Sequence, residues 1–128
     1  MIPRFRSWHK TWEELGKVKR IRFDGEGNVT TVLFEGKILG VNTHTDEIEL
    51  MQSTGLKDKN GKEIFEGDIV DYKGRKAVVK WHGSYASFIY RFVDEINERV
   101  SEWHPLFLAY YHFEIIGNIY ENKELLDA

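Results

Sequence analysis

Hydrophobic and polar residues alternate along much of this chain, in short runs that end at glycine, asparagine or aspartate. Alternation with a period of two places successive side chains on opposite faces of the backbone, as in half-buried β-strands. The runs that alternate, or that are rich in β-branched and aromatic residues, are 4–8, 18–23, 29–34, 47–52, 69–72, 75–81, 85–93 and 113–116. The pattern predicts a mainly β fold (a β-rich α+β fold) of short antiparallel strands.

The first half of the chain, residues 1–52, is expected to be an N-terminal β-rich subdomain that forms a β-meander. In the strand predicted over 18–23, a strict period of two places Val18, Arg20 and Arg22 on one face. A short apolar run, 38–41, lies before a polar connector. The boundary with the next subdomain is placed near Gln52.

One short helix is expected within this meander, at Thr11–Leu15. Thr11 is a suitable N-cap, acidic residues follow it in the first turn, and Gly16 ends the segment. The sequence therefore predicts a single helical turn between two strands.

The second half, residues 53–128, begins in the densest run of turn-forming residues. Asn60-Gly61 is a strong signal for a tight type I′ hairpin, in which both residues take positive φ and the charged tip lies in water. Gly67-Asp68 leads into a β-branched and aromatic run, as in small barrels of the SH3-like type. We therefore expect an SH3-like barrel subdomain, completed by a closing strand and a short C-terminal helix over 123–126.

The segment 93–112 has two interpretations. Phe92, Ile96, Val100 and Trp103 lie at helical spacing, which favours one helix. A hairpin loop between strands fits the same residues. The sequence does not decide between them.

The amino-acid composition excludes several classes of protein. The 128 residues are 41% hydrophobic, 14% aromatic and 30% charged, which fits one compact domain or two subdomains that share a core. The chain has no cysteine, so disulfide and thiolate chemistry are excluded. Its start lacks the apolar core of a signal peptide, and no apolar run is long enough to span a bilayer. We expect a cytoplasmic protein of the host cell with no membrane partner.

Charge is distributed unevenly along the chain. The net charge is −3, which argues against a protein that coats nucleic acid by charge alone. Residues 1–23 nevertheless hold seven basic and two acidic residues, for a net charge of +5, and the remainder carries −8. Opposite charges of this kind can attract each other within one chain or between copies.

The basic residues near the start are interleaved with aromatic ones and form a possible stripe for contact with nucleic acid or a partner. Exposed aromatic side chains of small β-barrels can stack on bases. The simpler interpretation is a solvated strand face whose aromatic residues point into the core, and Phe5, between two arginines, favours it. The candidate contact residues are Arg4, Arg6, Trp8, Lys19, Arg20 and Arg22.

The sequence contains no motif that is typical of a catalytic site or a metal site. Zinc sites use ligand pairs separated by two to five residues, and the five histidines offer no such pair. Three histidines directly follow a tryptophan, and in strands we expect that tryptophan to be buried and the histidine exposed. No nucleophile elbow or phosphate-binding loop is present. We predict no enzyme, and no catalytic, cofactor-binding or metal-binding residues.

Three segments carry a resemblance to a known family. Residues 50–70 read LMQSTGLKDKNGKEIFEGDIV, residues 113–122 read FEIIGNIYEN, and the opening RFRSW at 4–8 is basic and aromatic. Together they resemble the YopX family of phage and prophage proteins, and Ser87-Phe88 is similar to one of its middle strands. Residues 93–112 do not follow the family's pattern. The resemblance implies a small, β-rich protein encoded in phage genomes, with no biochemical function that can be carried over.

We therefore expect a phage or prophage accessory protein, most simply a non-enzymatic module that self-associates or binds another protein of the host or phage. A nucleic-acid-binding module that uses the N-terminal stripe is the alternative.

Overall fold

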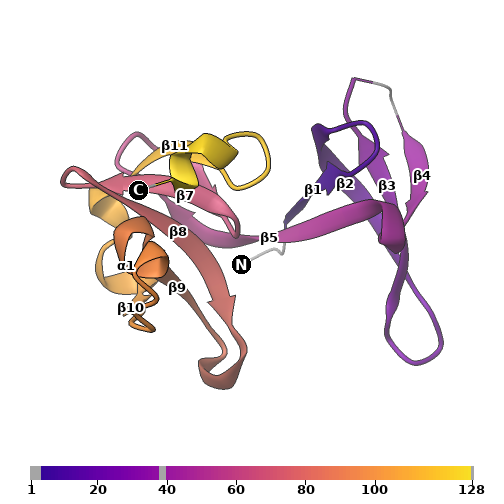
Figure 1. Ribbon diagram of the computed structural model, residues 1–128. Helices are drawn as coiled ribbons and strands as arrows, with labels where there is room; N and C mark the ends of the chain where they lie inside the picture. Colours follow the sequence, from indigo (N-terminus) through magenta and orange to yellow (C-terminus); the bar gives the residue numbers. More distant parts are fainter. Residues whose placement is uncertain (1–3, 38–39, 128) are drawn as a thin grey trace. The chain divides into compact units, whose positions relative to one another are not determined.

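The computed structural model describes residues 4–37 and 40–127 (Figure 1). The chain divides into two compact units, of which the first ends at Gln52 and the second begins at Ser53. Antiparallel strands form most of both units, so the predicted mainly β class is confirmed. Among the described residues, no helix has both the length and the apolar character needed to cross a bilayer.

The strands of the first unit belong to a six-stranded antiparallel sheet with the order β4-β3-β2-β1-β5-β6, whose last strand, β6, lies in the second unit. Its first four strands pair in the order of the chain, which is the meander expected from the sequence. A 3₁₀ turn, Thr45–Glu47, leads into the fifth strand. The strands are β1 (Phe5–His9), β2 (Glu14–Phe23), β3 (Val29–Glu35), β4 (Val41–His44) and β5 (Ile48–Lys57). Of the apolar run 38–41, residues 38–39 lie outside the described residues, and Val41 begins β4.

A small core lies on one face of this sheet. Val32, Phe34 and Ile48 are buried there, with Val18 and Ile21 packed against them. The core also dictates a glycine at position 16, because a Cβ on Gly16 would lie 2.4 Å from the Phe34 ring.

The predicted helix at Thr11–Leu15 is wrong. The structure has a tight turn between β1 and β2, with Glu13 at a φ of +50°. The Trp12 N–H donates to Nδ1 of His9 at 3.1 Å, and the two rings stack with their centroids 3.9 Å apart. His9 is buried, and its ring meets Phe34 edge-on. A single turn of helix is costly to nucleate. The tight turn forms instead, and it places the Trp12 ring over Phe34 of the core.

The second unit contains a five-stranded antiparallel sheet with the order β10-β9-β8-β7-β11, and a short strand that pairs with the end of β5. Its core includes Ile64, Val70, Val79, Leu106 and Phe113. The strands are β6 (Glu63–Phe65), β7 (Asp68–Tyr72), β8 (Arg75–His82), β9 (Ser87–Phe92), β10 (His104–Pro105) and β11 (Glu114–Asn118).

The predicted SH3-like barrel is not confirmed. Among the strands that the structure describes in this unit, β10 and β11 each pair on one side only, so the sheet order stays open. A closing strand does follow the aromatic segment, as β11, and it pairs with β7.

The segment 93–112 combines parts of both interpretations. A short helix, α1 (Val93–Asn97), follows β9 directly. The chain then returns as β10, where His104 pairs with Tyr90 in β9. Two 3₁₀ turns, Leu106–Leu108 and Tyr110–His112, complete the segment.

The turn at Asn60-Gly61 is wider than the predicted type I′ hairpin. Gly61 has a φ of +82°, but Asn60 is absent from the residues with positive φ. The N–H of Asp58 donates to the Lys62 carbonyl at 2.8 Å, and Oδ1 of Asp58 accepts from the N–H groups of Asn60 and Lys62. Asp58 is therefore a buried structural residue of a five-residue loop, not part of a solvated tip.

The C-terminal motif also forms a turn. The buried Asn118 accepts hydrogen bonds at Oδ1 from the N–H groups of Tyr120 and Glu121. Asn122 Oδ1 accepts from the Asn118 N–H at 3.1 Å. A 3₁₀ turn at Lys123–Leu126 forms as expected, without a cap from the Asn122 side chain. The residues behind the family resemblance thus include several that hold turns in place.

Candidate interaction surfaces

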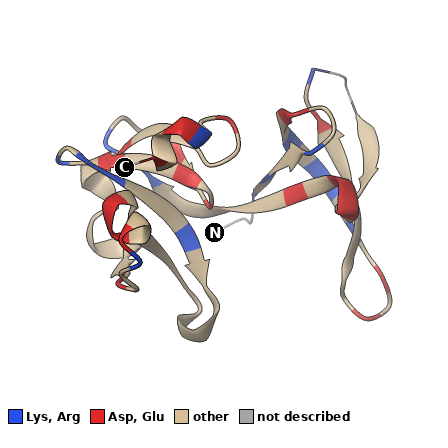
Figure 2. Ribbon diagram, viewed as in Figure 1, with Lys and Arg blue, Asp and Glu red and all other residues tan. Residues whose placement is uncertain are grey.

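The predicted basic stripe lies mainly on one face of the first sheet. Arg6 pairs directly with Lys17, and Trp8 with Leu15, across β1 and β2. Directly paired residues of antiparallel strands share a face. Figure 2 shows Lys and Arg residues on the strands of this unit.

A β-bulge in β2 decides which face the later basic residues take. Val18 pairs with Phe34 and Arg20 with Leu33, so Lys19 is an extra residue in β2. The bulge leaves Val18 toward the core and turns Arg20 outward. The predicted alternation that placed Val18, Arg20 and Arg22 together is therefore wrong.

The result is a basic face, which we define as Arg6, Lys17, Arg20 and Arg22 together with Trp8. Arg20 and Arg22 pair with Leu33 and Thr31, which alternate with the buried Val32 and Phe34 of β3.

The other stripe residues lie around the basic face. Arg4 is exposed just before β1, and Lys19 is exposed in the bulge. Phe5 alternates with Arg6 and so faces the other side of the sheet, as the simpler interpretation predicted. Trp8 departs from that interpretation, because it shares the face of the arginines.

A second surface is formed by the 3₁₀ turns before β11, and sequence reasoning missed it. Phe107 and Leu108 are each 61% exposed, and Tyr111 is 55% exposed. We call these three residues the aromatic surface. Leu106, Ala109 and Phe113 of the same segment are buried. The alternation of buried and exposed apolar residues at intervals of about three is the signal that was available in the sequence.

Another group of rings lies where β8 meets β9. Trp81 is exposed and His82 half-buried, which reverses the prediction of a buried tryptophan and an exposed histidine. The His82 ring contacts Tyr85 and Trp103, with centroids 4.9 and 4.8 Å away. At Trp8-His9 the prediction is also wrong, since His9 is buried.

The local structure shifts the pKa values of several ionisable groups, among them Asp94, Asp24 and Tyr90. The Arg75 guanidinium, by its hydrogen bonds, lowers the pKa of the Asp94 carboxyl below 3.8. Backbone N–H donors of Asn28 and Glu26 lower the pKa of Asp24. Burial raises the pKa of the Tyr90 hydroxyl.

These observations define a small, mainly β protein with a basic face in one unit and an aromatic surface in the other. The YopX protein family matches residues 4–127, nearly the whole chain, and the chain belongs to that family. The crystal structure of protein EF1440 from Enterococcus faecalis is similar to it, with 28% sequence identity and a TM-score of 0.68. That match covers 99% of each chain. No curated protein matches the chain.

Proposed function

We propose that this chain is a non-enzymatic accessory protein of a phage or prophage that self-associates through its aromatic surface, in the cytoplasm of the host. The observation that carries the proposal is the exposure of Phe107, Leu108 and Tyr111 within five consecutive residues. Contiguous exposed apolar side chains are typical of protein interaction sites, and Phe and Tyr are enriched in them.

The segment that carries this surface is held in place from below. Leu106 and Phe113 are fully buried, and the Phe113 ring contacts Tyr72 and Tyr90. The Ala109 N–H donates to the Leu106 carbonyl and the Phe113 N–H to the Tyr110 carbonyl. A surface fixed in this way loses little conformational entropy when it is covered by a partner.

Size-exclusion chromatography with light scattering tests the proposal. Wild-type protein should elute with a mass above that of one chain, and the triple variant F107S/L108S/Y111S should be monomeric. Phe23→Ser is the matched control, because Phe23 is also 61% exposed but lies in the first unit. A wild-type monomer at every concentration would exclude self-association. An oligomer that survives the triple substitution would exclude this surface.

Nucleic-acid binding is a second candidate, favoured by the shared face of Arg6, Arg20, Arg22 and Trp8. Cations around an aromatic ring can contact phosphates while the ring stacks on a base. At low salt, wild-type protein should bind single-stranded DNA or RNA, and R20E/R22E should lose most of that binding. Lys62→Glu, an exposed position in the second unit, is the control. Wild-type protein that fails to bind at about 50 mM salt, where phosphate contacts are strong, would end this candidate.

A further inference from the structure

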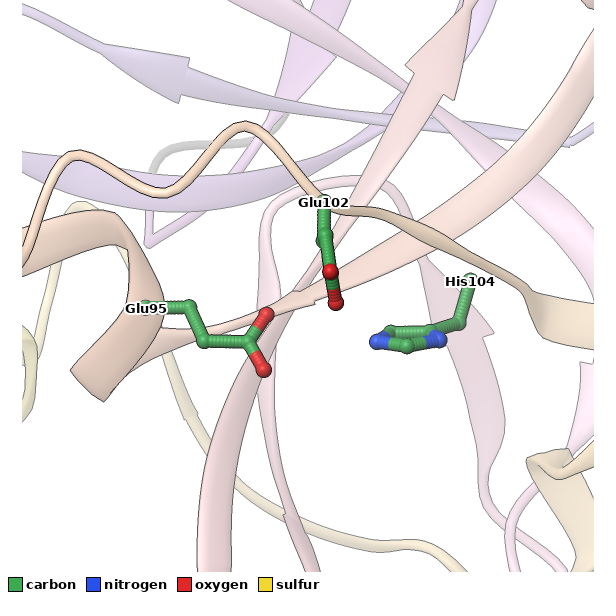
Figure 3. A group of neighbouring side chains, drawn as sticks. All are labelled: Glu95, Glu102 and His104. Carbon is green, nitrogen blue, oxygen red and sulfur yellow. The ribbon is translucent and has the colours of Figure 1, made fainter.

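We propose that Glu95, Glu102 and His104 form a binding site for one divalent transition-metal ion, of which Zn²⁺ fits best. One ligand atom from each of these side chains lies within 4.8 Å of the other two. Figure 3 shows the two carboxylates and the imidazole directed toward a common space. The proposal does not depend on the proposed function above.

The three ligands come from neighbouring parts of the second unit. Glu95 belongs to α1, Glu102 lies two residues before His104, and His104 begins β10. Only one of the three ligands is a histidine, so the absence of closely spaced histidine pairs in the sequence does not exclude this site. Glu102 and His104 are two residues apart, and their ligand atoms lie within 4.8 Å of each other and of a Glu95 carboxylate oxygen.

Two buried polar atoms point to a ligand. Oε2 of Glu95 and Nε2 of His104 are both buried, and neither has a hydrogen-bond partner. Buried polar atoms without a partner are costly, and native structures hold few of them. Both unpartnered atoms belong to the same three-residue cluster, and a shared cation would satisfy them together.

Contacts outside the cluster hold Glu95 in place. The other oxygen of Glu95, Oε1, accepts a hydrogen bond from Nη2 of Arg75 at 3.3 Å. That guanidinium lies over the Phe92 ring, 3.6 Å from its centroid, and also contacts Asp94. One oxygen of Glu95 is thus anchored and the other remains available.

His104 and the segment before it are held as well. The His104 ring stacks on Tyr90 with a centroid distance of 5.1 Å and meets the Phe92 ring edge-on. Nη2 of Arg91 donates to the Val100 carbonyl at 2.6 Å, which ties the segment before Glu102 to β9. Support of this kind orients metal ligands and adds to affinity.

The donor set determines the class of ion. One imidazole nitrogen and two carboxylate oxygens suit Zn²⁺, whereas Ca²⁺ prefers oxygen alone. With Zn²⁺ bonds of about 2.1 Å, ligand atoms lie roughly 3.5 Å apart, so the cluster must close by roughly 1 Å. Glu102 is exposed and can rotate to supply this closure. Three protein ligands leave a fourth position for water, and the ion would fix the 98–103 loop to α1.

Isothermal titration of the EDTA-treated, dialysed full chain with ZnCl₂ tests the site. Wild-type protein should bind one ion per chain. Glu95→Gln, Glu102→Gln and His104→Gln should each weaken binding at least about tenfold, which is the smallest effect usual for groups that only support ligands. Glu98→Gln, in the same segment but outside the cluster, should bind as wild type does.

Thermal unfolding gives an independent readout. An ion that binds only the folded chain raises the unfolding temperature, so Zn²⁺ should stabilise the wild type and the Glu98→Gln control. At the same Zn²⁺ concentration it should raise the unfolding temperature of Glu102→Gln less than that of the wild type, and because Glu102 is exposed, this variant should fold normally. Absence of saturable binding by the wild type, or equal binding by wild type and Glu102→Gln, would overturn the proposal.

Discussion

Oδ2 of Asp58 accepts a hydrogen bond of 3.0 Å from the backbone N–H of Ile115, which is 57 residues away in the sequence. The Lys59 N–H donates to the Phe113 carbonyl next to it, at 2.9 Å. The loop at 58–62 is thereby attached to the beginning of β11. Two of the segments that carry the family resemblance thus meet at one buried carboxylate.

Replacing Asp58 by Asn should destabilise the protein by about 1–3 kcal/mol, because the amide nitrogen cannot accept from Ile115 and a part-buried N–H loses its partner. Chemical denaturation of the variant measures the change. Glu114→Gln is the control, since it removes only the exposed ion pair with Lys59. That pair should contribute less than about 1 kcal/mol. Equal effects of the two substitutions would show that Asp58 has no special structural role.

Gly16→Ala should destabilise the first unit by roughly 1–3 kcal/mol, the usual cost of forcing an extra methyl group into a packed core. The new Cβ would lie 2.4 Å from the Phe34 ring and 2.9 Å from the Glu35 carbonyl oxygen. Gly25→Ala is the matched control, because a Cβ there would meet nothing within 4 Å. Unfolding followed by Trp fluorescence compares the two. A silent Gly16→Ala substitution would contradict the described packing.

The contact between Arg75 and Asp94 should make stability depend on pH in the acidic range. Hydrogen bonds from Arg75 lower the folded-state pKa of Asp94 below its ordinary value of 3.8. The contact therefore stabilises the folded state above about pH 4 and is lost as the pH falls through that lower pKa. The difference in unfolding free energy between wild type and Asp94→Asn should shrink in this acidic range. For the control, Glu98→Gln, the difference in unfolding free energy from wild type should not shrink as the pH falls. A difference between wild type and Asp94→Asn that stays constant over the acidic range would refute the interpretation.

Much of the fold could be predicted because strand periodicity and glycine turns are local signals. The meander of the first unit and the strands β7, β8 and β9 follow from them. Failures occurred where a distant partner decided the outcome. The turn at Trp12 depends on His9 and Phe34, and the burial of Asp58 depends on Ile115. No alternation pattern records such partners.

In the candidate sites, too, the residue types could be read from the sequence, but their arrangement could not. The basic stripe was visible as residue types, but its face depends on the bulge at Lys19, which is a property of pairing with β3. The aromatic surface depends on which apolar side chains of the segment 105–113 are buried in the core and which stay exposed. The cluster of Glu95, Glu102 and His104 needs the α1 helix to bring Glu95 beside the segment that leads into β10. Each of these features requires tertiary structure.

The most direct test of the account is sedimentation equilibrium of the whole wild-type chain over a rising series of concentrations. If the aromatic surface joins copies of this chain, the average mass should rise from that of one chain toward a whole-number multiple, and F107S/L108S/Y111S should stay at the mass of one chain. A wild-type mass equal to that of a single chain at every concentration would contradict it.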